Sequence, residues 1–440
     1  MTDAWTSKTM SLELQRVATR ARRDPDAQFH SLAHLLDVAA LHRTFARLPK
    51  RSAAGIDGVT KEMYGQNLEA NLRGLHERLR TKRYRHQPIR RVHIPKDNGK
   101  TRPLGISTLE DKIVQGALRE LLETVYEQDF LDCSYGYRPG RGPHDAIRAF
   151  TRIAGTGRVN WIYEADIASF FDSVDRTTLL DLIKRRVPDG SIRRLVGKCL
   201  HVGVLDGEEL TLPEEGTAQG SKLSPLLANI YLHHALDLWF TQEVQPHLQG
   251  WATLLRFADD FIICLTREDD ARRIVDLVPQ RMAEFNLKIQ PDKTRLIPFR
   301  RPPRSQQNGK GPGSFDFLGF THYWRRSRRG NWVVACKTRR ARFRRAVTNL
   351  NEYCRTHRHD PVAAQHARLS RGMQGHYQFY GVNGNARALA RLYYMARRVW
   401  HKWLNRRSQR GRLNWERFEE GLLKDYPLPR PRICVQIWGP

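Results

Sequence analysis

An apolar run broken by two adjacent aspartates occupies residues 254–265. It reads Leu254-Leu255-Arg256-Phe257-Ala258-Asp259-Asp260-Phe261-Ile262-Ile263-Cys264-Leu265. The pattern predicts two short strands joined by a tight turn, with Asp259 and Asp260 at its tip. Burying unpaired carboxylates is costly, so both must be solvated, paired or bound to cations. By itself, an Asp-Asp pair is more typical of an ordinary hairpin turn than of a catalytic site.

A second predicted strand, over residues 161–167, also carries an acid near its end, Asp166. If the two strands are neighbours, Asp166 converges with Asp259, and Asp260 lies close by. Several anionic oxygen ligands suit Mg²⁺ or, alternatively, Mn²⁺. Two such ions can activate an attacking hydroxyl and stabilise a leaving pyrophosphate in an in-line phosphoryl transfer. The alternative for Asp166 is a helix cap without a role in chemistry.

The remaining chain is predicted to be mostly helical. Apolar residues at spacings of three and four predict helices over 10–48 (with a break at Asp24-Pro25), 64–81, 109–130, 176–201 and 223–245. Residues 88–95 alternate as an extended segment, and breaker residues predict a loop over 300–314. The chain beyond Trp332 is predicted to be almost wholly helical and basic. The simplest architecture is an α+β central module followed by an α-helical basic appendage.

The charge is distributed unevenly. The 440 residues include 75 Lys and Arg against 46 Asp and Glu, a formal net charge of +29. Residues 301–440 hold 30 basic and 7 acidic residues, a net of +23, which leaves +6 for the first 300. Eleven basic residues also lie between Arg73 and Arg102, with only two acids among them. Two basic blocks around a nearly neutral centre indicate surfaces for nucleic-acid phosphates rather than for an anionic membrane.

Composition argues against several other classes. No apolar run approaches the roughly 18–20 residues needed to span a bilayer, and residues 1–23 lack the apolar core of a signal peptide. The six Cys residues never form a C-x-x-C spacing, which argues against a zinc ribbon or a secreted disulfide scaffold and fits a reducing cytosol. The aromatic residues, 10 Trp, 14 Tyr and 17 Phe, argue against disorder.

Seven segments form an ordered series along the chain. They are Arg102–Ile106 with Leu109–Lys112, Tyr135–Arg141 with His144, Asp166–Phe171, Gly216–Ser221 with Leu223–Ile230, Phe257–Asp260, Lys293-Thr294 and Phe317–Phe320. In this order they resemble the motifs of reverse transcriptases encoded by bacterial group II introns. Phe257–Asp260 is similar to the Tyr-Ala-Asp-Asp box of that family. A lone Asp-Asp box would be a weak signal, whereas seven motifs in order are highly specific.

The resemblance implies a right-hand polymerase with fingers and a palm built on a ferredoxin-like antiparallel sheet. An α-helical thumb or maturase domain and a short basic C-terminal segment would follow. The implied division is an N-terminal helical extension with a template-covering loop, fingers and palm, thumb or maturase domain, and a DNA-binding segment: 1–70, 71–325, 326–400 and 401–440. Many relatives carry a further Cys- and His-containing endonuclease module, and none is expected here because no such segment follows Ile433.

The resemblance also assigns roles to residues. Asp166, Asp259 and Asp260 match the catalytic aspartates, and the Ile167 carbonyl helps to hold the metal. The implied nucleotide-binding residues are Lys96 and Arg102 on the triphosphate, Phe171 under the sugar, where it excludes a 2′-hydroxyl, Gln219 in the pocket, and Gly220 near the base pair. The implied primer grip is Phe317, Leu318, Gly319 and Phe320. The predicted RNA contacts are Arg339, Arg340, Arg344, Tyr377 and Tyr380, with helix core as the alternative for the two tyrosines.

Three positions depart from the family pattern. Phe257 lacks the hydroxyl of the usual Tyr, Ala218 replaces the usual Pro, and Ser221-Lys222 replaces a pair that typically contains Gly. The metal ligands are unchanged, so we expect activity to survive. Phe257 is expected to lose a hydrogen bond near the primer end, and the other two departures are expected to alter the rigidity of the nucleotide pocket and fidelity.

The implied function is an RNA-directed DNA polymerase that also binds its intron RNA and promotes splicing. Retrohoming would proceed by target-primed reverse transcription from a host-supplied primer. The implied partners are structured intron RNA, an RNA template with a DNA primer, dNTPs and target DNA. The alternatives are a domesticated reverse transcriptase in phage defence or CRISPR spacer acquisition, and an RNA-binding splicing cofactor without polymerase activity. The expected location is the bacterial cytoplasm in association with the nucleoid, and the oligomeric state stays open between monomer and homodimer.

Overall fold

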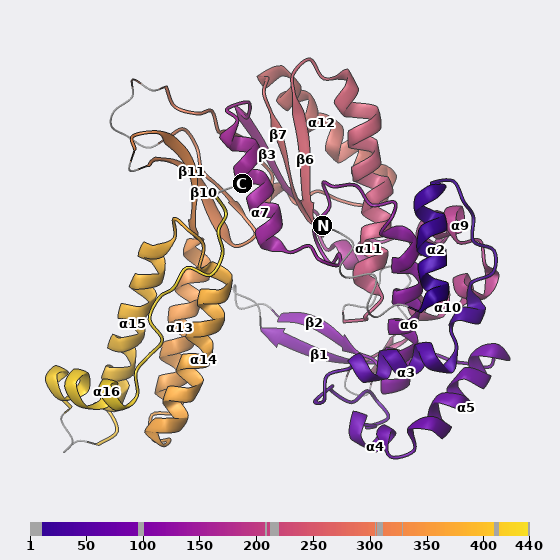
Figure 1. The fold of residues 1–440 in the computed structure, drawn as a ribbon, viewed down its shortest axis with the longest axis horizontal. Coiled ribbons are helices and arrows are strands. Elements are labelled where there is room, and N and C mark those ends of the chain that lie inside the picture. The colour runs from indigo at the N-terminus through magenta and orange to yellow at the C-terminus, as the bar shows by residue number, and fades with distance from the viewer. Residues whose placement is uncertain are drawn as a thin grey trace. The chain divides into compact units, whose positions relative to one another are not determined.

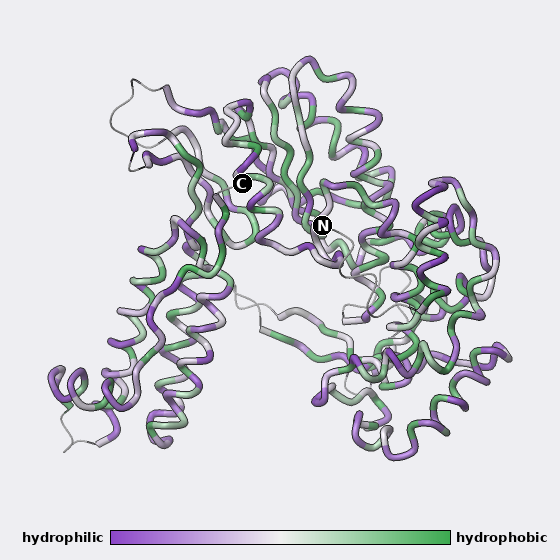
Figure 2. The backbone as a smooth tube through the Cα atoms, in the orientation of Figure 1, coloured by the Kyte–Doolittle hydropathy of each residue, from purple (hydrophilic) through white to green (hydrophobic). Residues whose placement is uncertain are grey.

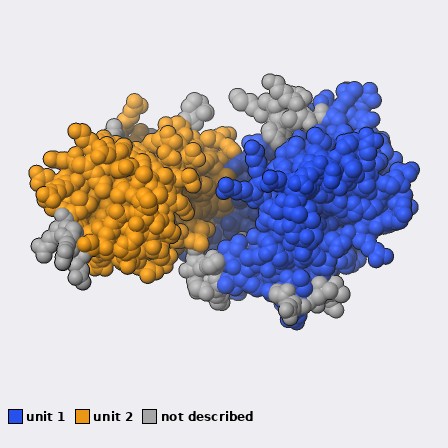
Figure 3. Space-filling model, turned by 90° about the horizontal axis from the view of Figure 1, so that it is seen from below, with its two compact units in different colours: residues 1–142, 163–263, 269–295 blue, residues 143–162, 264–268, 296–440 orange. Residues whose placement is uncertain are grey.

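The computed structural model describes residues 11–95, 101–206, 209–211, 220–303, 305, 311–327, 329–408 and 413–438. Helices and three small sheets give an α+β fold with a helical C-terminal part, as expected (Figure 1). The chain divides into two compact units, coloured separately in Figure 3. Unit 1 consists of Met1–Gly142, Tyr163–Ile263 and Asp269–Arg295, and unit 2 of Pro143–Ile162, Cys264–Glu268 and Leu296–Pro440.

Unit 1 contains most of the predicted helices. The Asp37 carboxylate accepts the Ala40 amide at 2.7 Å and so caps α3, and Thr108 caps α6. Both α2 and α3 contact α6, whose inner face is fully buried. The helices are α2 (Leu12–Arg23), α3 (Val38–Arg47), α4 (Lys61–Gly65), α5 (Leu68–Arg80), α6 (Leu109–Tyr126), α8 (Phe170–Ser173), α9 (Arg176–Arg186), α10 (Gly190–Leu200), α11 (Ser224–Leu232) and α12 (Glu268–Glu284), with the short turns η1 (Ala33–Leu35), η3 (Gln245–His247) and η4 (Pro291–Lys293).

Two predicted helices differ in detail from the structure. Residues 176–201 form α9 and α10 rather than one helix, because Pro188 disfavours helical backbone at Val187 and Asp189 starts a new helix. The Asp189 carboxylate accepts the Ser191 amide at 2.8 Å. Residues 223–245 form α11 and then a π-helical stretch, η2 (His233–Val244).

The first sheet of unit 1 has the strand order β2-β1-β4-β5. Strand β1 (Ile89–Pro95), predicted as extended, runs antiparallel to β2 (Thr101–Ile106), and Ile94 lies opposite Arg102. On its other edge β1 pairs in parallel with β4 (Val204–Asp206), which pairs with β5 (Glu209–Thr211).

The second sheet contains both acid-bearing strands and has the order β6-β7-β3-β8. Its strands are β6 (Ala252–Phe257), β7 (Asp260–Leu265), β3 (Trp161–Asp166) and β8 (Arg295–Pro298). Strands β6 and β7 are joined by the two residues Ala258 and Asp259, so they form the predicted tight hairpin. Strand β3 lies beside β7, as the convergence of the acids requires. These strands lie in a strongly hydrophobic part of the chain in Figure 2.

Unit 2 combines helix α7 (Pro143–Gly155) with a three-stranded sheet of order β11-β10-β9. The strands are β9 (Phe315–Phe317), β10 (Phe320–Arg326) and β11 (Trp332–Thr338), and both pairings are antiparallel. The prediction that the chain is helical beyond Trp332 is therefore wrong for residues 332–338. Trp332, Val334 and Cys336 are buried and alternate along this strand, the pattern of a sheet with a covered face.

The rest of unit 2 is helical, as predicted. Its helices are α13 (Arg340–Thr356), α14 (Val362–Tyr380), α15 (Ala386–Leu404), the π-helical η5 (Arg417–Leu422) and α16 (Leu423–Asp425). Helices α13, α14 and α15 lie side by side in Figure 1 and share a core that includes Leu369, Met373 and Trp400. Among the described residues, no helix is long and apolar enough to cross a membrane.

Candidate active site

The turn between β6 and β7 is strained. Ala258, its first central residue, has φ of +57°, and Asp259 is not among the residues with positive φ, a pattern of signs typical of a type II′ turn. A side chain other than hydrogen at positive φ persists only where its surroundings fix it. Here the Arg256 guanidinium donates to the Ala258 carbonyl oxygen at 3.1 Å. The Arg256 side chain therefore stabilises the backbone of the turn that carries the aspartates.

The side chains of Asp166 and Asp260 lie close enough that Asp166 raises the pKa of Asp260, through its charge and a side-chain hydrogen bond. Asp166 ends β3 and Asp260 begins the neighbouring β7, so the pairing of the strands brings them together. Part of the Asp260 side chain is exposed, yet desolvation by the surrounding protein, followed by the charges of Asp259 and Asp166, raises the pKa of Asp260 to about 7. The predicted strands are neighbours, and the charges of both Asp259 and Asp166 act on Asp260; the catalytic role of the three aspartates stays a prediction.

A lysine already balances part of this negative charge. The ammonium group of Lys293, at the end of η4, forms an ion pair with Asp166, and its charge lowers the pKa of Asp260. The Lys293 side chain is 65 % exposed, so it can leave this position without a packing cost. Lys293 belongs to one of the seven motifs but was not among the predicted site residues. Its place in that motif was the signal that could have identified it.

The donors at this site suit a divalent cation that also binds its substrate. Among the described residues, no group of three or more His, Cys, Asp or Glu side chains is arranged to hold a metal ion by itself. Mg²⁺ in nucleotide-transferring sites is commonly bound by one or two carboxylates plus substrate phosphates, not by a cage made of protein alone. The adjacent, like-charged carboxylates of Asp166 and Asp260 meet that requirement.

The Ile167 carbonyl, predicted to help hold the metal, is not used by the adjoining strand. Ile167 forms an isolated antiparallel bridge with Ile289. The hydrogen bonds of that bridge come from the flanking residues, from the Gln290 amide to the Asp166 carbonyl at 2.8 Å and from the Ala168 amide to the Lys288 carbonyl at 2.7 Å. In such a pair the carbonyl of the central residue points away from its partner strand. The Ile167 carbonyl therefore points away from Ile289, toward the other edge of its segment.

Phe171 follows β3 on the short helix α8. Its neighbour Phe170 is 3 % exposed and packs against Tyr231 with ring centroids 6.4 Å apart. Phe171 itself is only half-buried. The core position is thus filled by Phe170, which leaves the ring of Phe171 available for the predicted contact with a nucleotide sugar.

The backbone of Gly220 lies close to another part of the protein, whereas the predicted neighbour was a base pair. Its φ is +112°, and a Cβ atom at this position would lie 2.3 Å from the carbonyl oxygen of Gly105 in β2. The predicted approach to a base pair stays a prediction. Lys96, Gln219 and Ala218 lie outside the described residues, as does the side chain of Arg102.

The predicted primer grip is a two-residue hairpin in unit 2. Phe317 pairs with Phe320 across the turn, and Leu318 and Gly319 have φ of +51° and +81°, the signs of a type I′ turn. The Arg339 amide donates to the Gly319 carbonyl at 3.0 Å. The Phe320 ring packs against Phe379 and Tyr380, with centroids 5.8 and 5.2 Å away. These contacts attach the hairpin to the start of α13 and to the end of α14.

The residues predicted to contact RNA differ in burial: Tyr377 is buried, and the others are at least partly exposed. Tyr377 is fully buried in the core shared by α13, α14 and α15, so the prediction that it contacts RNA is wrong and helix core is the correct alternative. Tyr380 is half-buried against the primer-grip hairpin. Arg339 forms an ion pair with Asp316 at 2.9 Å. Arg340 and Arg344 are exposed on α13, and their contact with RNA stays a prediction.

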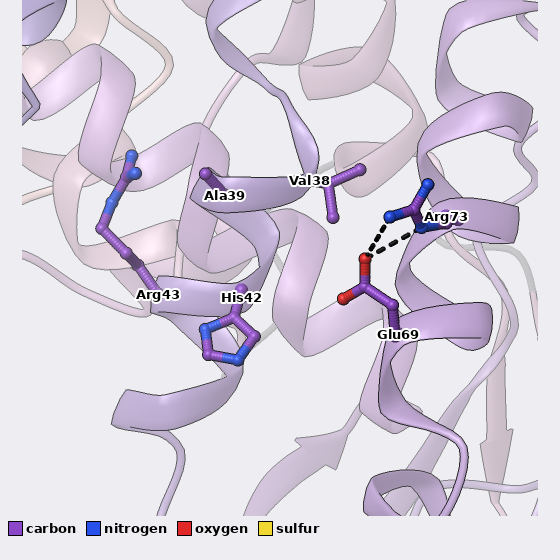
Figure 4. A pocket seen from close by; sticks show the side chains of 6 residues that line it. All are labelled: Val38, Ala39, His42, Arg43, Glu69 and Arg73. Carbon is purple, nitrogen blue, oxygen red and sulfur yellow. Dashed lines mark hydrogen bonds and ion pairs between the residues drawn. The ribbon is translucent and has the colours of Figure 1, made fainter.

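A separate pocket is lined by residues that are distant in sequence from these aspartates. It measures about 540 Å³ and is lined by side chains of α3 and α5, which are Val38, Ala39, His42, Arg43, Glu69 and Arg73 (Figure 4). Its acid, Glu69, is paired with Arg73 at 2.8 Å. This pocket brings together no set of groups that would support catalysis.

Comparison with known proteins agrees with the geometry. Residues 94–322 match the family model described as reverse transcriptase (RNA-dependent DNA polymerase). Protein YkfC of Escherichia coli K12 is 31 % identical over 374 residues, which cover 77 % of this chain and 95 % of that protein. The group II intron-encoded protein LtrA of Lactococcus lactis is 36 % identical over 236 residues, 53 % of this chain and 39 % of LtrA. Nuclear intron maturase 1 of Arabidopsis thaliana is 30 % identical over 92 residues, 21 % of this chain and 12 % of that protein.

The matched region includes the strands that carry Asp166, Asp259 and Asp260, and it ends within β10, just after the primer-grip hairpin. Reverse transcriptase domains generally use divalent metal ions, which agrees with the carboxylates at this site. The chain therefore belongs to the reverse transcriptases, the RNA-directed DNA polymerases, and resembles the group II intron-encoded proteins among them.

Proposed function

We propose that this reverse transcriptase copies its intron RNA into DNA at a DNA target, starting from a primer supplied by the host, and that it binds the same RNA to promote splicing. The observation that carries the proposal is the contact between Asp166 and Asp260 at adjacent strand ends, with Asp259 beside them and Lys293 on Asp166. A protein that only bound RNA would have no need for like-charged carboxylates in contact. This favours a polymerase over a splicing cofactor without catalysis.

In the proposed reaction, the 3′-oxygen of the primer bonds to the α-phosphorus of a dNTP. The bond from that phosphorus to the oxygen bridging to the β-phosphate breaks, pyrophosphate leaves, and the proton of the hydroxyl passes to solvent. Two Mg²⁺ ions, or Mn²⁺, held by Asp166, Asp259 and Asp260 with the Ile167 carbonyl, would supply stabilisation of the attacking and leaving oxygens. The protein orients both reactants around these residues.

The other predicted residues have supporting roles in this proposal. Phe171 packs under the sugar of the incoming nucleotide and selects against a 2′-hydroxyl. Lys96, Arg102, Gln219 and Gly220 complete the nucleotide site. Phe317 to Phe320 hold the primer strand, and the type I′ turn supports this by fixing the hairpin backbone.

RNA binding is proposed for the basic helical part of unit 2. Arg340 and Arg344 are exposed on α13, and residues 301–440 carry a net charge of +23. Arginine on a helical surface suits RNA phosphates. The proposed partners are the structured intron RNA and the target DNA, in the bacterial cytoplasm near the nucleoid. We retain the division at residues 70, 325 and 400 as a proposal for how these tasks are shared.

Extension of a DNA primer on an RNA template tests the polymerase assignment. Asp260→Asn should lower extension by more than about 100-fold, because loss of a charge-stabilising ligand removes several kcal/mol of transition-state stabilisation. The matched control is Glu69→Gln, which removes an exposed carboxylate and should extend normally. Full extension by Asp260→Asn would refute the metal assignment.

Splicing of the flanking intron RNA tests the second part. Wild-type protein should accelerate splicing of its own intron at low Mg²⁺, and Asp260→Asn should do so equally well because it retains the RNA surface. No acceleration by either protein would refute the maturase role and leave the polymerase role intact.

A further inference from the structure

The segment Cys133–Arg138, which overlaps the start of the motif Tyr135–Arg141, lies directly against the hairpin of β6 and β7. Ser134 forms a parallel bridge with Arg256 of β6. The Arg256 amide donates to the Cys133 carbonyl at 2.8 Å, and the Tyr135 amide donates to the Arg256 carbonyl at 2.9 Å. The segment therefore adds a short strand at the edge of β6, beside the turn with the aspartates.

Gly136 allows this contact to be closer than another residue would permit. A Cβ atom on Gly136 would lie 2.3 Å from the Ala258 nitrogen and 2.9 Å from the Phe257 carbonyl carbon. Both neighbours are backbone atoms, so they cannot move aside cheaply. The Gly136 carbonyl is fixed in turn by the Asn229 side-chain amide, which donates to it at 2.7 Å.

Arg138 fixes the other end of the segment. Its side chain is 3 % exposed and forms an ion pair with Glu127 at 2.7 Å. The same guanidinium donates to the carbonyls of Leu131 at 2.7 Å and Ser134 at 3.0 Å. The residue between Gly136 and Arg138 is thus held between two anchored neighbours.

That residue, Tyr137, combines strain with exposure. Its φ is +59°, a conformation that is unfavourable for an aromatic residue and that persists only where the surroundings enforce it. Its side chain is 47 % exposed. Its ring centroid lies 6.5 Å from that of Phe257, with the ring planes at 42°. The anchored segment therefore displays an aromatic ring next to the residue that precedes the catalytic turn.

The strand order indicates what this ring faces. Strand β7 separates β6 from β3, so Phe257, with Tyr137 beside it, lies on the opposite flank of Asp260 from β3, the strand that leads into the helix with Phe171. In an in-line displacement the attacking and leaving groups lie on opposite sides of the phosphorus. If Phe171 lies under the incoming sugar, the primer end approaches from the flank of β6. Aromatic rings stack on bases of single strands and strand ends without regard to sequence.

We propose that Tyr137 contacts the 3′-terminal nucleotide of the primer through its ring, and that the Cys133–Arg138 segment is fixed to the catalytic hairpin in order to present it. The proposal rests on primer extension by this chain. It assigns a substrate contact to the motif Tyr135–Arg141, for which the resemblance implied no specific role.

The test compares Tyr137→Asn and Tyr137→Phe in single-nucleotide extension on an RNA template. Asn tolerates positive φ and lacks the ring, so Tyr137→Asn removes the contact and keeps the backbone. It should raise the KM for primer–template by about 5- to 100-fold, the range for losing one stacked base, and leave the KM for dNTP unchanged. Tyr137→Phe should match the wild type. Leu12→Ala, which also removes an exposed apolar side chain in unit 1, is the control and should be unaffected.

A primer with an abasic 3′ end separates stacking from a structural effect. Without the terminal base, wild-type protein and Tyr137→Asn should have the same KM for primer–template. An unchanged primer KM in Tyr137→Asn, an increase confined to dNTP, or a difference that survives on the abasic primer would each overturn the proposal. If the wild type and Leu12→Ala do not extend any primer, it is the polymerase function that fails.

Discussion

The guanidinium of Arg256 and the carboxylate of Asp237 form a bidentate ion pair without solvent access. Nε lies 2.7 Å from Oδ1 and Nη2 lies 2.5 Å from Oδ2. The remaining donors of Arg256 reach Asn229 Oδ1 and Ser134 Oγ, both at 2.9 Å, and the carbonyl of Ala258. Because the last bond lies within the strained turn, the pair links the π-helical stretch η2 to the turn that carries Asp259 and Asp260.

Asp237→Asn should destabilise the protein strongly. It leaves the Arg256 guanidinium buried without its counter-charge, which costs about 3–5 kcal/mol in comparable cases. The free energy of unfolding, measured by urea titration, should fall by that order, and kcat should fall while the KM for primer–template changes less. The control is Arg73→Gln, which breaks the exposed pair with Glu69 and should cost under about 1 kcal/mol. Equal losses of unfolding free energy in the two variants would show that the buried pair contributes no more to stability than the exposed pair.

Gly220→Ala should lower stability for a different reason, because the backbones of Gly220 and Gly105 lie in close contact. The new Cβ would meet the Gly105 carbonyl oxygen at 2.3 Å, and φ of +112° is strained for any L side chain. We expect a loss of about 1–3 kcal/mol in stability and a higher KM for dNTP. Gly74→Ala is the matched control, because no atom lies within 4 Å of the added methyl and helix α5 should gain roughly 0.5–1 kcal/mol. A stable Gly220→Ala with normal kinetics would contradict the close approach.

Features of the site that depend on neighbouring residues in the sequence could be predicted. Side-chain pairs between residues far apart in the sequence could not. The apolar run interrupted by Asp259 and Asp260 predicts the hairpin that the structure contains. No pattern linked Arg256 to Asp237, because a pairing between a strand and a π-helical stretch leaves no periodic signal. Arg339 was expected to face RNA, and its ion pair with Asp316 appears only once the sheet of unit 2 has formed.

Errors in the C-terminal part have a common cause. The many arginines there predict contacts with nucleic acid and carry no signal of packing. Tyr377 lies on this basic stretch, but its position on α14 faces the bundle core, the stated alternative. Residues 332–338 adjoin the same basic stretch, but Val333 and Val334 are β-branched and favour the strand that they form.

Acid should destabilise unit 2 through His322. This side chain has no solvent access and packs against the rings of Phe150 and Phe315, with centroids 5.0 and 5.1 Å away. Burial lowers the pKa of His322 from 6.5 to about 4. Between these values the unfolded chain binds a proton that the folded chain does not, so stability is lost as pH falls from 6.5 toward 4. His322→Gln, which cannot titrate, should reduce the slope of unfolding free energy against pH in this window by up to about 1.4 kcal/mol per unit. An identical slope in the variant would contradict the assignment.

The exposed arginines of α13 should determine the salt dependence of RNA binding. Arg340 and Arg344 are exposed one turn apart on that helix, so a single RNA backbone can contact both. Each phosphate contact that is lost lowers the slope of log K against log salt by roughly 1. The double variant Arg340→Gln, Arg344→Gln should therefore bind intron RNA more weakly, with a slope shallower by roughly 2. Tyr377→Phe is the control, because a ring in the helix core cannot contact RNA and the slope should remain that of the wild type. A steep slope retained in the double variant would place the phosphate contacts on other residues of the basic surface.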